Sequence, residues 1–277
     1  MIITHKIAAL TATFTTAMSF LAAPAMAFSV GQTSNLQTLT NNLLGNNTAG
    51  LSNFSLSITG DEQAFGTFTG DPFGLNSGIV MSTGRVTDLP GPNSDGVDLS
   101  TDFGPFGATG DLSELNLSFF ADSTAEKLFF QYVFGSEEFL EFGGTSFNDS
   151  FELLLNGTNL AKLSDGQTVT INNLVPNAND RSTDNPDYIN NPSGLAGSII
   201  KLDGYTKVLG FEGLLNKNQT NVLTVRIKDV GDGSYDSAVF IQGSVGSEPV
   251  PEPMTVGGLM AGSAMLAAGR KLRARRK

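Results

Sequence analysis

The chain has 277 residues, 40% of them hydrophobic and 16% charged, which is enough apolar material for one large domain or two ordinary ones. It contains no cysteine, and its single histidine is His5. Beyond the N-terminal segment this composition excludes disulfides, Ser-His-Asp and Cys-His catalysis, and histidine-ligated zinc or iron. Carboxylate chemistry and oxygen-ligated calcium stay open.

The acidic charge is concentrated in the middle of the chain. Seven of the 16 basic residues lie in 1–6 and 270–277, so residues 28–253 combine 9 basic with all 27 acidic residues, a formal net charge of −18. Such a surface repels nucleic acid and anionic lipid and attracts cations, so we expect no nucleic-acid partner. Solubility alone explains the charge equally well.

The N-terminus has the layout of a Sec signal peptide. A short basic segment, 1–6, precedes an apolar segment, 7–22, and Ala25-Met26-Ala27 supplies the small residues that a signal peptidase needs. The sequence predicts export through the Sec translocon and cleavage after Ala27, which removes residues 1–27. The alternative is an uncleaved membrane anchor.

The central region is predicted to be all-β. A short helix is expected at 34–44, with Ser34 as its cap and Gly45 at its end. Residues 88–111 and 172–198 are predicted as long loops rich in Asp, Asn and Pro. Apolar alternation and turn residues predict ten strands, at 54–59, 65–69, 78–83, 115–120, 127–134, 151–155, 168–171, 205–211, 221–228 and 238–245.

Two of these strands predict how the sheets are buried. Residues 221–228 alternate, with Leu223, Val225 and Ile227 facing inward, whereas 127–134 is almost continuously apolar, as in a strand buried on both faces. We expect one β-sandwich or jelly-roll-like domain over 28–247. An N-terminal signal helix and a C-terminal hydrophobic sorting helix flank it.

Acidic turns follow or precede several of these strands. Carboxylates gathered at strand ends repel one another unless they lie apart in water or a cation offsets the repulsion, and a set without His or Cys favours calcium. The alternative is a group of turn-forming acids with no metal. The candidate calcium ligands are Glu137, Glu138, Asp149, Asp229, Asp232 and Asp236.

The C-terminal segment, 248–277, resembles the PEP-CTERM sorting signal. Pro251-Glu252-Pro253 precedes an apolar run, 254–269, and the basic tail RKLRARRK. The resemblance implies processing by an exosortase in a Gram-negative bacterium, usually one that makes exopolysaccharide. The segment would contact the membrane as a transmembrane helix before processing. The alternative is an ordinary C-terminal membrane anchor.

The region between the two ends resembles the choice-of-anchor L domain. The segments YVFGSEEF, SFNDSFELLLNG, VTINN, LDGYT and IKDVGDGSYDSAVF occur in that family's order and spacing, and SGIVMSTG resembles its upstream part. The family occurs on bacterial surface proteins with various C-terminal anchors, and no established enzymatic activity is attached to it. The resemblance implies a protein held at the cell surface or outer membrane, or released.

These observations favour a non-catalytic structural or adhesion module of the cell surface or extracellular matrix, with exopolysaccharide or surface proteins as partners. The first alternative is a lectin-like module that binds exopolysaccharide. With no Trp, its stacking platforms would come from Phe residues or from the four tyrosines. The second is a carboxylate glycosidase, with Glu137 or Glu138 opposite Asp236.

Overall fold

The computed structural model describes residues 27–45, 48–94, 96–104, 111–194 and 199–245. The predicted signal peptide up to residue 26, with Ala25, and the predicted sorting segment from 248 onward, with Pro251, Glu252 and Pro253, lie outside these residues. In the described part, no helix has both the length and the apolar character needed to cross a membrane.

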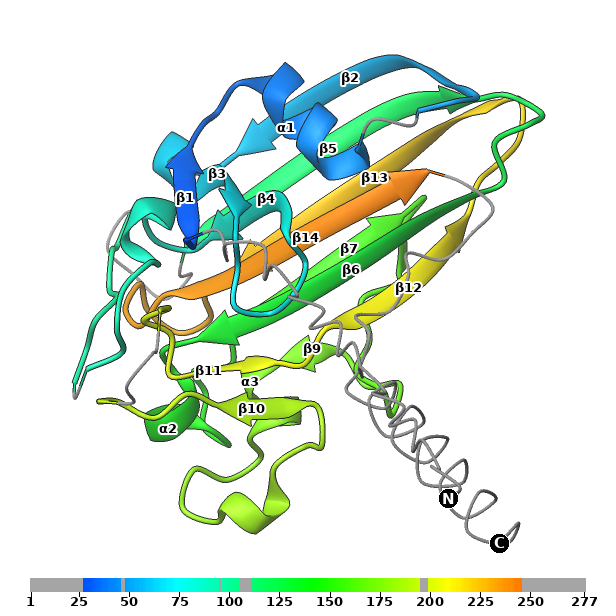
Figure 1. Cartoon of the computed structure of the whole chain (residues 1–277). Coiled ribbons are helices and arrows are strands. Elements are labelled where there is room, and N and C mark those ends of the chain that lie inside the picture. Colours follow the sequence, from blue (N-terminus) through cyan, green and yellow to red (C-terminus); the bar gives the residue numbers. More distant parts are fainter. Residues whose placement is uncertain (1–26, 46–47, 95, 105–110, 195–198, 246–277) are drawn as a thin grey trace, which may run out of the picture.

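The described strands form two antiparallel sheets, which Figure 1 shows as two stacked layers. The first, sheet A, has the order β1-β3-β4-β14-β6-β11-β10, and β12 also pairs with β6. Its strands are β1 (Ser29–Gln32), β3 (Phe65–Thr69), β4 (Ser77–Ser82), β6 (Lys127–Ser136), β10 (Tyr188–Asn190), β11 (Gly204–Thr206), β12 (Leu209–Leu214) and β14 (Ser237–Val245).

The second sheet, sheet B, has the order β2-β5-β13-β7-β8, and β9 also pairs with β7. Its strands are β2 (Leu51–Thr59), β5 (Leu112–Ala121), β7 (Ser150–Leu155), β8 (Thr158–Asn159), β9 (Val169–Thr170) and β13 (Gln219–Lys228). Among the described residues, three short helices accompany the sheets, α1 (Leu36–Leu44), α2 (Phe139–Phe142) and α3 (Ile171–Leu174), with 3-10 turns at Glu62–Ala64, Val86–Asp88 and Arg181–Thr183.

The main core lies between the two sheets. Alternate residues of β13, Leu223, Val225 and Ile227, are fully buried in it, as the period-2 pattern predicts for a strand with one inward face. Tyr132 and Phe151, from opposite sheets, meet with ring centroids 5.0 Å apart. The all-β sandwich predicted from the sequence is confirmed.

Strand β6 is buried on both faces, as its continuous apolar run predicts. Leu128, Phe130, Tyr132 and Phe134 enter the core between the sheets, whereas Val133 enters a second apolar cluster on the outer face of sheet A. Segments from the long connections cover that face. The residues that they contribute to the second cluster include Leu75, Val86, Leu89, Leu99, Ile200 and Leu202.

The structure corrects the predicted start of one helix and the predicted extent of one strand. Asn35, not Ser34, caps α1, because its side chain accepts a hydrogen bond from the Thr38 N–H at 2.9 Å. The predicted strand 205–211 is two strands, β11 and β12. Both pair with β6, but the register shifts between them, because Tyr205 is paired with Gly135 and Leu209 with Tyr132.

The loop predicted at 172–198 is partly ordered by secondary structure. It contains most of α3, a 3-10 turn and β10, which pairs with β11. The predicted strand 168–171 is shorter than expected, because α3 begins at Ile171 with Thr170 as its cap. The polar, Asn-rich sequence contains no periodic signal for these elements. Strand β10 depends on its pairing with β11, whereas α3 and the 3-10 turn are capped locally by the side chains of Thr170 and Asp180.

Candidate functional site

Antiparallel pairing brings the predicted acidic turns to one end of the sandwich, here called the acidic end. Strand β6 ends at Ser136 and β14 begins at Ser237, and these two residues are paired. In sheet B, the last residue of β13, Lys228, is paired with the first residue of β7, Ser150. The acidic end therefore consists of Glu137, Glu138, Asp149, Asp229, Asp232 and Asp236 (Figure 1, where β6 ends).

Most of these carboxylates are buried, which is costly for an ionised group unless it is paired. Glu137 and Asp149 are 0% exposed, Glu138 and Asp229 are 1% exposed, and Asp236 is 3% exposed. Asp232 is exposed to solvent. The acidic end is thus a buried feature rather than a solvated acidic surface.

Asp149 joins the two sheets. One of its oxygens accepts a hydrogen bond from the Val230 N–H at 2.9 Å, and the other accepts one from the Ser237 hydroxyl at 2.7 Å. Asp149 precedes β7 of sheet B, whereas Ser237 begins β14 of sheet A. Burial raises the pKa of Asp149 to about 7, although these two hydrogen bonds oppose the rise.

Asp229 and Glu138 lack such partners. Both carboxylate oxygens of Asp229 and the Oε2 atom of Glu138 are buried without a hydrogen-bond partner among the described residues. Burial raises the pKa of Asp229 to about 9, and the charges of Asp149, Asp232 and Glu138 add to the rise. The pKa of Glu138 is also raised to about 9, by burial and by the charges of Asp149 and Asp232. These four carboxylates therefore form one electrostatic group.

Glu137 belongs to a different group. Its Oε1 atom accepts a hydrogen bond from the Asp98 N–H at 3.2 Å. Burial raises its pKa to about 9, and the charges of Asp203 and Asp98 contribute. Asp203 is itself buried, with a pKa raised to about 6 by burial, and it accepts a hydrogen bond from the Asn93 side chain at 3.0 Å. Our sequence reasoning missed Asp203, and its position in LDGYT, after an apolar residue and before a glycine, was the available signal.

Asp236 lies in a third environment, separate from the two groups described above. Both of its oxygens accept from the Thr101 N–H, at 3.0 and 3.2 Å. Burial raises its pKa to about 7, with the charges of Asp111, Asp149 and Asp88 adding to the rise. Gly84 packs so closely against this carboxylate that a side chain at residue 84 would overlap it.

The structure therefore distributes the six predicted calcium ligands over three environments. Across the described ranges, no three Asp, Glu, His or Cys side chains already surround a common metal position. The proposed glycosidase pair has an unfavourable placement. The Glu137 N–H donates to the Asp236 carbonyl at 3.2 Å, and both carboxyl groups are buried, whereas a glycosidase pair must face its substrate.

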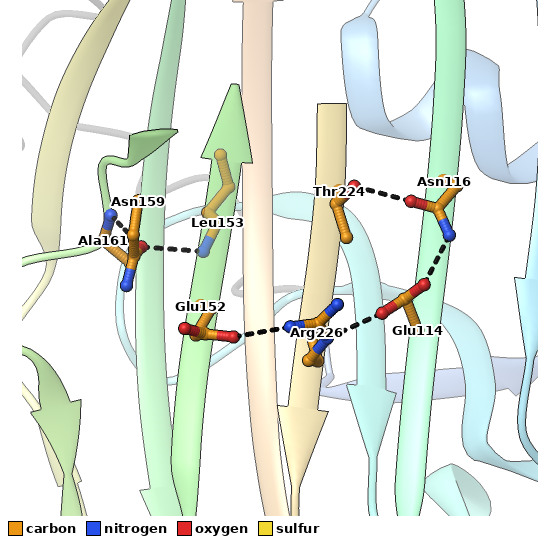
Figure 2. Close-up of polar contacts among 8 residues, drawn as sticks. All are labelled: Glu114, Asn116, Glu152, Leu153, Asn159, Ala161, Thr224 and Arg226. Carbon is orange, nitrogen blue, oxygen red and sulfur yellow. Dashed lines mark hydrogen bonds and ion pairs between the residues drawn. The ribbon is translucent and has the colours of Figure 1, made fainter. Parts of the chain in front are cut away.

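A second candidate region lies on the outer face of sheet B, where a ladder of polar side chains crosses three strands (Figure 2). Arg226 of β13 pairs with Glu114 of β5 at 2.6 Å and with Glu152 of β7 at 2.9 Å. Asn116 donates to Glu114 at 2.5 Å and accepts from Thr224 at 2.5 Å. Although burial opposes it, hydrogen bonds from Asn116 and Arg226 lower the pKa of Glu114. We call these five residues the polar ladder.

The polar ladder is half-exposed, and it continues into exposed hydroxyl groups on the edge strand β2. Ser57 is paired with Asn116 and Thr59 with Glu114, and both β2 residues are exposed. Phe120 lies on the same outer face, because it follows the inward-facing Phe119 in the strand, and its side chain is half-buried. The face offers fixed hydrogen-bonding groups and one aromatic ring to solvent.

Two solved structures share a low overall similarity with the chain. A family 35 carbohydrate binding module from an environmental isolate has 10% sequence identity and a TM-score of 0.22, covering 59% of this chain and 88% of that one. The enzymatically active domain of tailspike protein 4 of bacteriophage CBA120 has 10% identity and a TM-score of 0.27, covering 77% of this chain but only 21% of that one. Neither similarity bears on function. No curated protein matches the sequence.

The strongest comparison is with a protein family. The model of the choice-of-anchor L domain matches residues 28–245, which include every described strand. The same residues hold the acidic end and the polar ladder. This assignment implies an extracellular or cell-surface protein. The chain therefore belongs to the choice-of-anchor L family.

Proposed function

We propose that the protein is an exported, non-catalytic structural or adhesion module of a bacterial cell surface or extracellular matrix. It leaves the cytoplasm through the Sec translocon, and signal peptidase removes residues 1–27. The C-terminal segment then holds it in the inner membrane until an exosortase processes it at Pro251-Glu252-Pro253. The family match over 28–245, framed by these two addressing segments, carries the proposal.

The placement of the acidic residues supports a non-catalytic role. General acids, general bases and nucleophiles must reach a substrate, and side chains from the acidic end are mostly buried in the sandwich. The absence of His and Cys from residues 28–277 removes the commonest alternatives for acid-base and nucleophilic catalysis. The buried acidic side chains and the absence of His and Cys fit a stable β-sandwich that acts through side chains on its surface.

Export and sorting are tested with the full-length chain, carrying a C-terminal tag, in a bacterium that has an exosortase. We expect mass spectrometry to find a mature N-terminus at Phe28, and we expect the tag to be lost from the surface or released fraction. Glu252→Ala should leave the tag attached in the inner-membrane fraction.

The control for sorting is Pro249→Ala, a change two residues before the motif, which should be processed normally. Retention of the tag on the unmodified protein in an exosortase-positive host would contradict sorting. In that case the C-terminal segment would be an ordinary membrane anchor.

A second function, binding of exopolysaccharide, is favoured by the polar ladder. Sugar hydroxyls pair well with carboxylate, guanidinium and amide groups that are already held in place, because little side-chain entropy is then lost on binding. Arg226 is held by two carboxylates, and Asn116 by a carboxylate and a hydroxyl. Phe120, further along β5 on the same face, supplies an apolar ring for a sugar face.

This binding is tested by co-sedimentation of the protein with exopolysaccharide from the producing organism. Arg226→Ala should weaken binding about tenfold, because a hydrogen bond to a charged group contributes about 1.5–3 kcal/mol. The matched control is Lys127→Ala, which also removes a basic partner of a carboxylate, Glu212, but on sheet A. Equal losses in both variants, or no binding by the unmodified protein, would contradict a glycan site at the polar ladder.

A further inference from the structure

The buried carboxylate of Asp229 has no partner that would account for its position. It is 1% exposed, and neither of its oxygens has a hydrogen-bond partner among the described residues. Native structures rarely leave a buried polar group unpaired, and an unpaired group points to a bound water or ion. A carboxylate with two open oxygens is suited to a cation rather than to another acceptor.

The surroundings of Asp229 supply further carboxylate oxygens. The charges that act on it come from Asp149, Asp232, Glu138 and Asp111. Glu138 also has a buried Oε2 atom without a partner. None of the ion pairs among the described residues involves these carboxylates.

The same carboxylates come from separate parts of the chain. Glu138 follows β6 of sheet A, whereas Asp149 precedes β7 and Asp229 follows β13, both in sheet B. Asp229 and Asp149 lie one position beyond the last pair of the β13–β7 ladder, Lys228 with Ser150. A cation here would contact both layers of the sandwich at one end.

We propose that Asp229 and Glu138 bind a divalent cation, calcium, with Asp149 and Asp232 as neighbouring carboxylates that strengthen its attraction. Calcium accepts flexible sets of carboxylate, carbonyl and water oxygens, so two carboxylates with open oxygens can hold it when backbone oxygens and water complete the shell. The small, oxygen-only ligand set disfavours transition metals, which prefer imidazole or thiolate. The site does not depend on export or on glycan binding.

The cation would act as a structural clamp. Because the ligands come from both sheets, binding stabilises only the folded state, in which the strand ends are brought together. An extracellular protein without cysteine has no disulfides for this purpose. A calcium clamp at the acidic end would supply a comparable cross-link between layers.

The test is a calorimetric titration of the full-length chain with calcium chloride after EDTA treatment, together with thermal unfolding. We expect one saturable site per chain, and a rise in Tm of about 5 °C or more when calcium is 100 times Kd. Magnesium should bind much more weakly, because it requires a more regular octahedral shell. No heat and no Tm shift at millimolar calcium would overturn the proposal.

Two variants locate the site, and a third controls for charge. Asp229→Asn and Glu138→Gln keep side-chain shape and should each weaken calcium binding at least tenfold. Glu126→Gln makes the same charge change at an exposed residue preceding β6, at the opposite end of that strand, and should bind calcium normally. Unchanged calcium binding in both Asp229→Asn and Glu138→Gln would overturn the assignment of these two ligands. If a variant fails to fold, the titration of the unmodified chain still tests whether the protein binds calcium.

Discussion

Replacing Phe119 by alanine is expected to lower the free energy of unfolding by about 3–5 kcal/mol, because it removes a fully buried ring from the core between the sheets. The side chain faces inward from β5, between Leu117 and Ala121 on the same face. The loss should be measured by urea unfolding of the full-length chain. We expect an unchanged m-value, since the surface exposed on unfolding stays nearly the same.

The adjacent residue provides the control. Phe120 lies on the outer face of β5 and is half-buried, so Phe120→Ala should cost less than about 1 kcal/mol. The two substitutions are chemically identical and differ only in the face of the sheet. Equal losses in the two variants would contradict the inward placement of Phe119 and with it the register of β5 against β13.

The second large effect concerns pH and Asp236. Its pKa is raised to about 7 in the folded protein, chiefly by burial, from an ordinary value of 3.8. The folded state therefore keeps a proton that the unfolded chain releases near pH 4. The associated stabilisation is fully present below about pH 4 and is lost as the pH rises through 7.

The measurement is urea unfolding at several pH values with EDTA present, which removes any contribution from bound cations. Between pH 4.5 and 8 the unfolding free energy should fall by about 2–4 kcal/mol more in the unmodified protein than in Asp236→Asn. Asparagine is always neutral, and its amide oxygen can still accept from the Thr101 N–H. The charges of Asp111, Asp149 and Asp88 add to the rise in the pKa of Asp236.

The control for the loss of one negative charge in Asp236→Asn is Glu126→Gln. Glu126→Gln removes one acidic charge from an exposed residue outside the acidic end, so its stability should follow the pH profile of the unmodified protein. Parallel profiles for the unmodified protein and Asp236→Asn would show that Asp236 titrates alike in the folded and unfolded states. The buried environment that the structure gives to this carboxylate would then be wrong.

Local pattern was sufficient for most of the strands. The alternation of β13 placed Leu223, Val225 and Ile227 in the core, and the apolar run of β6 indicated burial on both faces. These predictions hold because side-chain direction follows from a period of two residues, whatever the strand pairs with. The break between β11 and β12 and the existence of β10 were missed, because both depend on strand pairing. The register against β6 changes between β11 and β12, and β10 is held by its pairing with β11.

Residue composition sets the chemistry available to this protein: many carboxylates, no cysteine, and no histidine after residue 5. The sequence also placed the acids at strand ends. Which acids share one environment and which are separated depends on the folded arrangement, since strand pairing across long stretches of chain brings them together. Asp149 and Ser237, 88 residues apart, form one hydrogen bond, whereas the adjacent Glu137 and Glu138 belong to different groups. Burial and the charge of distant neighbours set these pKa values, and neither can be computed from local sequence.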